Sequence, residues 1–202
     1  MEDLYFTEEH KMLRDMVRDF AQNEVKPLAR ELDEKGGFPY ESVKKMAELG
    51  LMGIPWDEKY GGTGMDTVAL VIAIEEIGKV CPSTSATMMA HTSLGTAPIA
   101  VFGTEEQKER YLPGLASGKQ IGAFGLTEPN AGSDAGSTQT EAVLNGNDYI
   151  INGQKSFCTN AGVAGIIIIR VTAEPGIEAI EAINPATTGF LGGLGLPIMF
   201  SW

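Results

Sequence analysis

The sequence predicts an α+β fold in which an N-terminal helical domain precedes a small antiparallel β domain. As far as Lys119, apolar residues recur at three- and four-residue steps, the spacing of amphipathic helices. From Gln120 onward, short stretches with strand character, separated by Asn-Gly turns, replace that spacing. Helices followed by strands favour separate α and β layers over an alternating βαβ sheet.

The composition indicates a globular protein. The chain has 202 residues, 43% of them hydrophobic, and a formal net charge of −12. This acidic balance argues against nucleic acid and anionic membranes as partners, because phosphate binding depends on Lys and Arg. Cys81 and Cys158 fit neither a disulfide framework nor a metal-binding spacing, and Cys158 is expected to be a small buried side chain. The acidic N-terminus lacks a signal-peptide pattern, so we expect a cytoplasmic protein. The cysteine spacing also leads us to expect no metal site.

The first helix is expected to begin at Thr7, whose hydroxyl can cap it, and to end at Gly36-Gly37. Pro27 should kink this helix without stopping it, because the apolar stripe resumes after the proline. A shorter helix should follow from Tyr40 to Leu49. The stripe of the first helix consists of Leu13, Met16, Val17, Phe20, Val25, Leu28 and Leu32.

Further helices are expected up to Lys119. The segment from Met65 to Val80 is apolar on most sides, which is typical of a central helix in a bundle. Thr104 and Gln107 form a capping box that should open a charged helix through Tyr111. These elements predict a helical domain over residues 1–119.

Five strand-like stretches follow, and they predict an incomplete middle β domain over residues 120–171. Asn145-Gly146 and Asn152-Gly153 are the turn signals between them. After Arg170 the sequence has no Lys or Arg and ends in an apolar, glycine-rich run, so we expect residues 172–202 to be an aberrant or frameshifted tail. The stretches are IGAFGLT, TQTEAVLNG, DYIING, QKSFCTN and IIIIRVT.

Several motifs fail as catalytic or binding sites. The run Gly114–Lys119 resembles a phosphate loop but has three residues between its glycines where four are needed. His10 and His91 lack a second histidine at metal-ligand spacing. Glu75-Glu76 point to different sides of a helix, so they are expected on a solvated face and do not form a catalytic pair.

Two glycine- and hydroxyl-containing stretches at strand ends are the candidate site. In FGLTEPNAGSDAGS, residues 124–137, Gly132 and Gly136 permit close backbone approach, and Thr127 and Ser133 supply hydroxyls. Such a loop alone is more often a hairpin connection than a ligand site. The second stretch, KSFCTNAG at residues 155–162, again places an aromatic residue and a threonine two apart, which favours a ligand site.

With these residues the sequence resembles the acyl-CoA dehydrogenase family, most closely its short-chain, butyryl-CoA type. The resemblance runs from about Phe6 to about Ile169 and includes PWDEKYGGTG, FGTEEQKERYLPGLASGK and NGQKSF.TNAG. It implies an N-terminal helical domain, a small middle β domain and a C-terminal four-helix domain. No counterpart of the last is evident, so we expect a chain truncated after the middle domain.

The resemblance implies FAD as the cofactor. Within the implied site, Thr127 would hydrogen-bond the reactive edge of the flavin, Ser133 would serve both the FAD phosphate and acyl-CoA, and Phe157 would cover one side of the ring. Met88, Met89 and Leu94 would form either the closed end of an acyl pocket or ordinary core. The implied cofactor-binding residues are Phe124, Leu126, Thr127, Ser133, Phe157 and Thr159.

The reaction that the resemblance implies is α,β-dehydrogenation of a short-chain acyl-CoA, with electrons passed to an electron-transfer flavoprotein. Its base is a Glu of the C-terminal domain, so no catalytic residue is assigned here, and the chain is expected to be inactive alone. The family's homotetramer interface is expected to be missing as well. The alternatives are a non-catalytic fragment or binding module, and a flavin monooxygenase or nitroalkane oxidase of the same fold.

Overall fold

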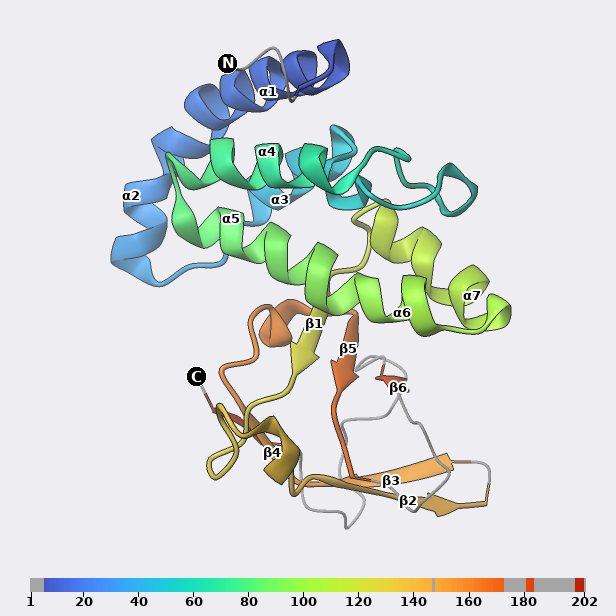
Figure 1. Ribbon diagram of the computed structural model, residues 1–202. Coiled ribbons are helices and arrows are strands. Elements are labelled where there is room, and N and C mark those ends of the chain that lie inside the picture. Colours follow the sequence, from blue (N-terminus) through green and yellow to red (C-terminus); the bar gives the residue numbers. More distant parts are fainter. Residues whose placement is uncertain (1–5, 147, 173–180, 184–198, 202) are drawn as a thin grey trace.

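The computed structural model describes residues 6–146, 148–172, 181–183 and 199–201. Helices form the upper part of the molecule, and strands hang below it, with β1 and β5 directly beneath the α5–α6 segment (Figure 1). The predicted α+β class and the order of its two parts are therefore confirmed. No helix in the described part of the chain combines the length and apolarity needed to cross a membrane.

Helix α1, Glu8–Phe20, begins at the predicted cap. Thr7 Oγ1 accepts a hydrogen bond from the backbone N–H of His10 at 3.2 Å, and His10 Nδ1 accepts one from the N–H of Thr7. His10 Nε2 lies 2.9 Å from Asp66 Oδ1, and Asp66 in turn caps α4, Thr67–Gly78. His10 therefore acts in capping and in joining two helix starts, which explains its burial.

The helical path continues past Pro27, as predicted. A π-helical turn, η2 (Ala21–Val25), follows α1, and α2 (Lys26–Lys35) runs at an angle to α1 (Figure 1). The wider π turn changes the direction of the helix just before the proline. Gly36 ends α2 in the left-handed conformation, with φ 62°.

The remaining helices follow in the part of the chain expected to be helical, and α3 (Tyr40–Glu48) and α4 begin and end within two residues of the predicted bounds. The predicted capping box at the start of α7 is present: Gln107 N–H donates to Thr104 Oγ1 at 3.2 Å, and Thr104 N–H donates to Gln107 Oε1 at 2.9 Å. These elements are α3 (Tyr40–Glu48), η3 (Leu51–Gly53), η4 (Glu58–Tyr60), α5 (Pro82–Met89), the π-helical η5 (Ala90–Thr96), α6 (Ala97–Phe102) and α7 (Glu105–Ala116).

Helix α7 is longer than predicted, because it passes Tyr111 and ends only at Ala116. Pro113 lies inside it and is exposed. Leu112 and Leu115 are buried in one cluster with isoleucines of β5. Burial of these two leucines stabilises the last turn enough to offset the hydrogen bond that the proline removes.

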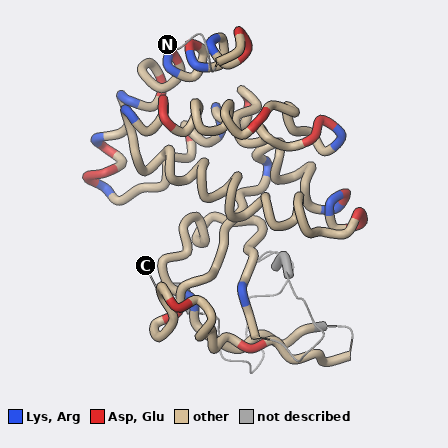
Figure 2. The backbone as a smooth tube through the Cα atoms, in the orientation of Figure 1, with Lys and Arg blue, Asp and Glu red and all other residues tan. Residues whose placement is uncertain are grey.

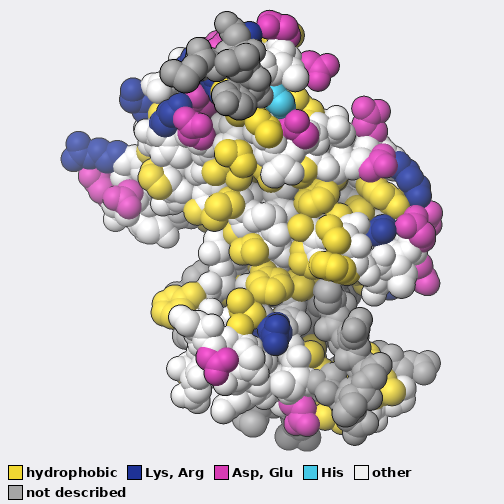
Figure 3. Space-filling model, in the orientation of Figure 1, with side chains coloured by type: hydrophobic (Ala, Val, Ile, Leu, Met, Phe, Trp, Pro, Cys, Tyr) yellow, Lys and Arg dark blue, Asp and Glu magenta, His cyan; other side chains and the backbone are white. Residues whose placement is uncertain are grey.

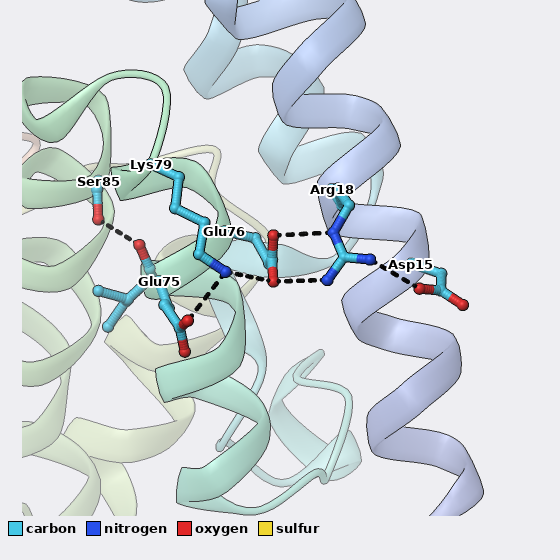
Figure 4. Close-up of polar contacts among 7 residues, drawn as sticks. Asp15, Arg18, Glu75, Glu76, Lys79 and Ser85 are labelled. Atoms are coloured by element: carbon cyan, nitrogen blue, oxygen red, sulfur yellow. Dashed lines mark hydrogen bonds and ion pairs between the residues drawn. The ribbon is translucent and has the colours of Figure 1, made fainter. Parts of the chain in front are cut away.

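An ion-pair network around one buried carboxylate joins α1 to α4 (Figure 4). Glu76 is 3% exposed, and its carboxylate accepts from Arg18 Nε at 3.2 Å, Arg18 Nη2 at 3.1 Å and Lys79 Nζ at 2.9 Å. Burial alone would raise the pKa of Glu76, but the hydrogen bonds from Arg18 and Lys79 outweigh it and lower the pKa. The expectation of a solvated face holds for Glu75 and is wrong for Glu76.

The strands pair less simply than predicted. β2 (Glu141–Asn145) and β3 (Asp148–Asn152) form an antiparallel hairpin at the expected Asn-Gly turn. β1 (Gly122–Gly125) and β5 (Ile166–Ile169), however, pair in parallel, so the prediction of an antiparallel domain is wrong for this pair. A strand pattern in the sequence identifies a strand but not its partner. The long connection from β1 to β5 returns the chain to the end of the sheet where β1 began, so the two strands run in parallel. The other pairs are β5 with β6 (Glu181–Ile183), antiparallel, and β4 (Gln154–Ser156) with β7 (Met199–Ser201), parallel.

The helical part packs directly on β1. His91 is fully buried, and its Nδ1 accepts a hydrogen bond from the backbone N–H of Gly122 at 2.9 Å. Burial lowers the pKa of His91 to about 4, so its ring stays neutral at physiological pH. Asn160 adds a second link, because its Nδ2 donates to Thr87 O at 2.9 Å and to Gly122 O at 3.3 Å. The two predicted domains therefore share a tightly packed junction.

Candidate functional site

Both candidate loops lie at strand ends and are hydrogen-bonded to each other. The first loop, residues 124–137, begins in β1, and the second, residues 155–162, begins in β4. Ser156 N–H donates to Thr127 O at 2.8 Å, and Cys158 Sγ donates to Phe124 O at 3.2 Å. Segments that are far apart in sequence thus form one continuous surface.

The structure brings most of the predicted site residues onto these adjoining segments. Phe124, Leu126 and Thr127 are half-buried on the first loop, and Phe157 and Thr159 are exposed on the second. Ser133 is exposed farther along the first loop, past a turn closed by hydrogen bonds between Glu128 and Ala131, and within the described residues no hydrogen bond joins it to the other five.

Phe157 has an unusual conformation for an aromatic residue. Its φ is +55°, in the left-handed region, and 80% of its surface is exposed. Left-handed backbone is costly for a bulky residue, and exposure of a phenylalanine removes the benefit of burial. Strained conformations of this kind cluster at binding sites, which makes Phe157 a candidate contact for a flat ligand.

A buried ion pair between Glu128 of the first loop and Lys155 of the second was not predicted from the sequence. Lys155 is completely buried, and its Nζ is 2.7 Å from Glu128 Oε1 and 3.2 Å from Leu126 O. Glu128 also accepts hydrogen bonds from the Thr140 hydroxyl, from Thr140 N–H at 2.9 Å and from Gln139 N–H at 2.7 Å. Nothing in the spacing of Glu128 and Lys155 marks them as partners, because 27 positions separate them.

The hydrogen bonds to Glu128 decide its ionisation. Burial would raise the pKa of this carboxyl, but the hydrogen bonds from Lys155, Thr140 and the two backbone N–H groups lower it to about 2. A general base works best with a pKa near the operating pH. Glu128 therefore positions the first loop and is not suited to remove a proton from a substrate.

We expect acid to weaken the fold through this carboxyl. A pKa of about 2, against an ordinary 4.5, means that ionised Glu128 stabilises the protein above about pH 4.5 and that this contribution is lost as the pH falls towards 2. The loss over that interval is roughly 3 kcal/mol. Urea unfolding at several pH values should show a steeper acid decline for the wild type than for Glu128→Gln/Lys155→Met. Parallel curves would contradict this account.

Cys158 is a structural thiol, as predicted. Its side chain is buried, and burial raises its pKa to about 11. The thiolate is the nucleophilic form of cysteine, and at neutral pH almost none is present at such a pKa. Within the described residues, no group of three or more His, Cys, Asp or Glu side chains is placed to hold a metal ion.

A broad apolar face continues upward from the two loops. The backbone positions of Lys, Arg, Asp and Glu lie mostly around the outer edge of the helical part (Figure 2), whereas hydrophobic side chains gather over α4, α5 and α6 (Figure 3). Met88 is buried as core, but Met89 and Leu94 are more than 40% exposed. Large exposed apolar patches mark contact surfaces. The exposed large apolar residues of α4, α5, η5 and α6 are Val68, Val71, Met89, Leu94, Val101 and Phe102.

Comparison with known families shows that both parts of the chain match domains of one family. Residues 7–119 match the acyl-CoA dehydrogenase N-terminal domain, and residues 123–189 match the acyl-CoA dehydrogenase middle domain. The second match includes part of the segment 172–202, whose aberrant origin stays a prediction, and most of that segment lies outside the described residues.

The chain is also similar to individual proteins and solved structures. The short-chain specific acyl-CoA dehydrogenase of Clostridium acetobutylicum is 54% identical over 182 residues, which are 88% of this chain and 48% of that protein. A structure of the Bacillus anthracis acyl-CoA dehydrogenase complexed with FAD has a TM-score of 0.78 at 37% identity, covering 84% of this chain and 30% of that one. A structure described as the electron transferring flavoprotein of Acidaminococcus fermentans has a TM-score of 0.79 at 44% identity, covering 81% and 43%.

The chain spans about half the length of the curated relatives it matches. The two domain matches together cover most of the helices and strands described above. The chain therefore belongs to the acyl-CoA dehydrogenase family.

Proposed function

We propose that this chain supplies the N-terminal and middle regions of a FAD-dependent dehydrogenase that oxidises short-chain acyl-CoA thioesters. The observation that carries the proposal is the pair of hydrogen-bonded loops with Phe157 exposed in a strained conformation. The similarity to a short-chain specific relative supports the substrate class.

The loops fit a flavin. Phe124 and Leu126 offer half-buried apolar side chains on the first loop, and the loop hydrogen-bonded to it carries the exposed ring of Phe157; a flat ring needs such apolar lining. A Cβ added at Gly132 would meet no atom within 4 Å, so the first loop leaves open space beside Ser133. We propose that Phe124, Leu126, Thr127, Ser133, Phe157 and Thr159 hold FAD.

When bound, FAD supplies a two-electron acceptor for the hydrogen removed from the β-carbon of the substrate. Thr127 and Thr159 offer hydroxyl donors, and Ser133 offers one to a phosphate or to acyl-CoA. The carboxylate of Glu128 lies on the first loop, but it is already bound by Lys155 and Thr140. The base that removes the α-proton is therefore proposed to come from the half of the family's sequence that this chain does not span.

The apolar face over α4 to α6 also supports the proposal that another part of the enzyme completes the site. The matches are to N-terminal and middle domains, and the relatives extend for as long again. We propose that the remaining part of the enzyme covers this face, that the chain alone lacks dehydrogenase activity and the family's homotetramer, and that the complete enzyme is cytoplasmic. An electron-transfer flavoprotein is the proposed acceptor, as the family resemblance implies, and a structure described by that name is among those similar to this chain.

Phe157→Ala should weaken FAD retention about tenfold, the effect of losing one favourable ring contact of about 1.4 kcal/mol. Equilibrium dialysis followed by flavin absorbance measures it. Because Phe157 is exposed, thermal unfolding should hardly change. Phe102→Ala is the matched control, since Phe102 is also an exposed phenylalanine but lies on α6, away from the loops.

The dialysis results distinguish a flavin-binding part of an enzyme from a chain that binds no flavin. Flavin retained by the wild type and lost with Phe157→Ala supports a partial cofactor site. No flavin retained by any variant indicates a non-catalytic fragment or binding module. Butyryl-CoA oxidation with an artificial acceptor tests the chemistry separately, and turnover by this chain alone would overturn the proposed absence of a base.

A further inference from the structure

Two exposed lysines of this acidic chain, Lys44 and Lys119, lack the ion pairs that most of its cations form among the described residues. Within the residues that the structure describes, neither Lys44 nor Lys119 forms an ion pair or hydrogen bond through its side chain, and both are exposed. Most other cations of the chain lie within ion-pair distance of an acid. These paired cations are Lys11, Arg18, Arg30, Lys35, Lys45, Lys59, Lys79, Lys108 and Lys155.

Both unpaired lysines line one groove of about 470 Å³ between α3 and the end of α7. Lys44 lies on the face of α3 that also carries Val43 and Ala47. Lys119 is brought beside that face by Gly118, whose φ is +69° and where a Cβ would lie 2.6 Å from the Ala47 Cβ. Only glycine permits this approach, so the position of Lys119 is built into the turn.

The rest of the groove is apolar and aromatic. Ile121 and Val163 contribute from the β side, and Phe38 and Tyr40 from the helical side. The two rings pack edge to face with centroids 4.8 Å apart, yet Tyr40 is 64% exposed. Glu48 also lines the groove, forms no ion pair with any cation in the described part of the chain, and offers an acceptor for an N–H group.

We propose that this groove binds a small organic anion with a flat aromatic ring, of mononucleotide size. The volume lies in the range of small-molecule sites, the two lysines match a phosphate, and Tyr40 with the apolar floor matches a ring. None of the six proposed flavin-binding residues lines the groove, so it is separate from the candidate flavin site. Two lysines against the single carboxylate of Glu48 leave the groove with a net positive charge, which favours an anion.

Isothermal titration of the full chain with AMP tests the proposal, with adenosine and inorganic phosphate as the ring-only and charge-only probes. AMP should bind about tenfold more tightly than either probe, because the two halves of the groove act together. Lys44→Ala/Lys119→Ala should weaken AMP binding about tenfold or more. Lys26→Ala/Lys35→Ala removes the same two charges from α2 and should leave the affinity within about twofold.

Circular dichroism should show that all variants fold, since the replaced side chains are on the surface. Phe157→Ala should not change AMP affinity. If AMP bound more weakly to Phe157→Ala but normally to Lys44→Ala/Lys119→Ala, the nucleotide would occupy the flavin loops and the inference would be wrong. Equal affinity for AMP, adenosine and phosphate, or no AMP binding, would also overturn it.

Discussion

Lys155→Met should be among the most damaging single substitutions in this protein, lowering the free energy of unfolding by about 3–5 kcal/mol. The change leaves the buried carboxylate of Glu128 without its cation and removes the hydrogen bond to Leu126 O. Since a domain of this size is stable by only about 5–15 kcal/mol, the β part should lose its structure first. Urea unfolding and hydrogen exchange of residues 122–172 would measure the loss.

The double variant Glu128→Gln/Lys155→Met separates the ion pair from simple packing. It removes both buried charges, so it should recover much of the stability that Lys155→Met loses. A single variant as stable as the wild type would show that the pair contributes nothing. A double variant no better than the single one would place the effect in the lysine stem and not in the unpaired charge.

Gly95→Ala should separate the helical part from β1 and cost roughly 3 kcal/mol of unfolding free energy, the upper part of the usual range for overpacking. A Cβ at Gly95 would lie 2.5 Å from the carbonyl carbon of Gly122 and 2.8 Å from Ala123 N. Both are backbone atoms, so no side-chain rotation relieves the overlap. Protection of the Gly122 N–H, which donates to His91 Nδ1, should fall in hydrogen exchange.

Gly78→Ala is the matched control for this substitution. Gly78 belongs to α4, and a Cβ there would lie 3.4 Å from Ser85 Oγ, at the edge of ordinary contact. The thermal midpoint of this variant should stay close to that of the wild type. If Gly95→Ala unfolded no more easily than Gly78→Ala, the close approach of η5 to β1 would not matter for stability.

Helix boundaries were largely predictable because their signals are local. Thr7, Gly36 and Thr104 cap or end helices through hydrogen bonds or backbone conformations within a few residues. The end of α7 was not predictable, because burial of Leu112 and Leu115 against distant residues of β5 overrides the local effect of Pro113.

The candidate site was predictable as two sequence segments but not as an arrangement. The roles of Phe124, Leu126, Thr127, Ser133, Phe157 and Thr159 stay proposals. What no local pattern indicated is the Glu128–Lys155 pair that holds the first loop from below. The burial of Glu76 and its pairing with Arg18 were missed for the same reason, since both depend on how α1 and α4 cross.

Sequence patterns were sufficient to predict the two-part α+β order, most of the helices, the hairpin turn at Asn145-Gly146 and the family. These features depend on residue periodicity, capping and recognisable strings, all of which are short-range. The folded chain was needed to show that β1 pairs with β5 in parallel, that His91 and Asn160 join the two parts, and that Lys44 and Lys119 share a groove. Those outcomes depend on contacts between residues remote in sequence, whose burial and charge are defined only once the chain has folded.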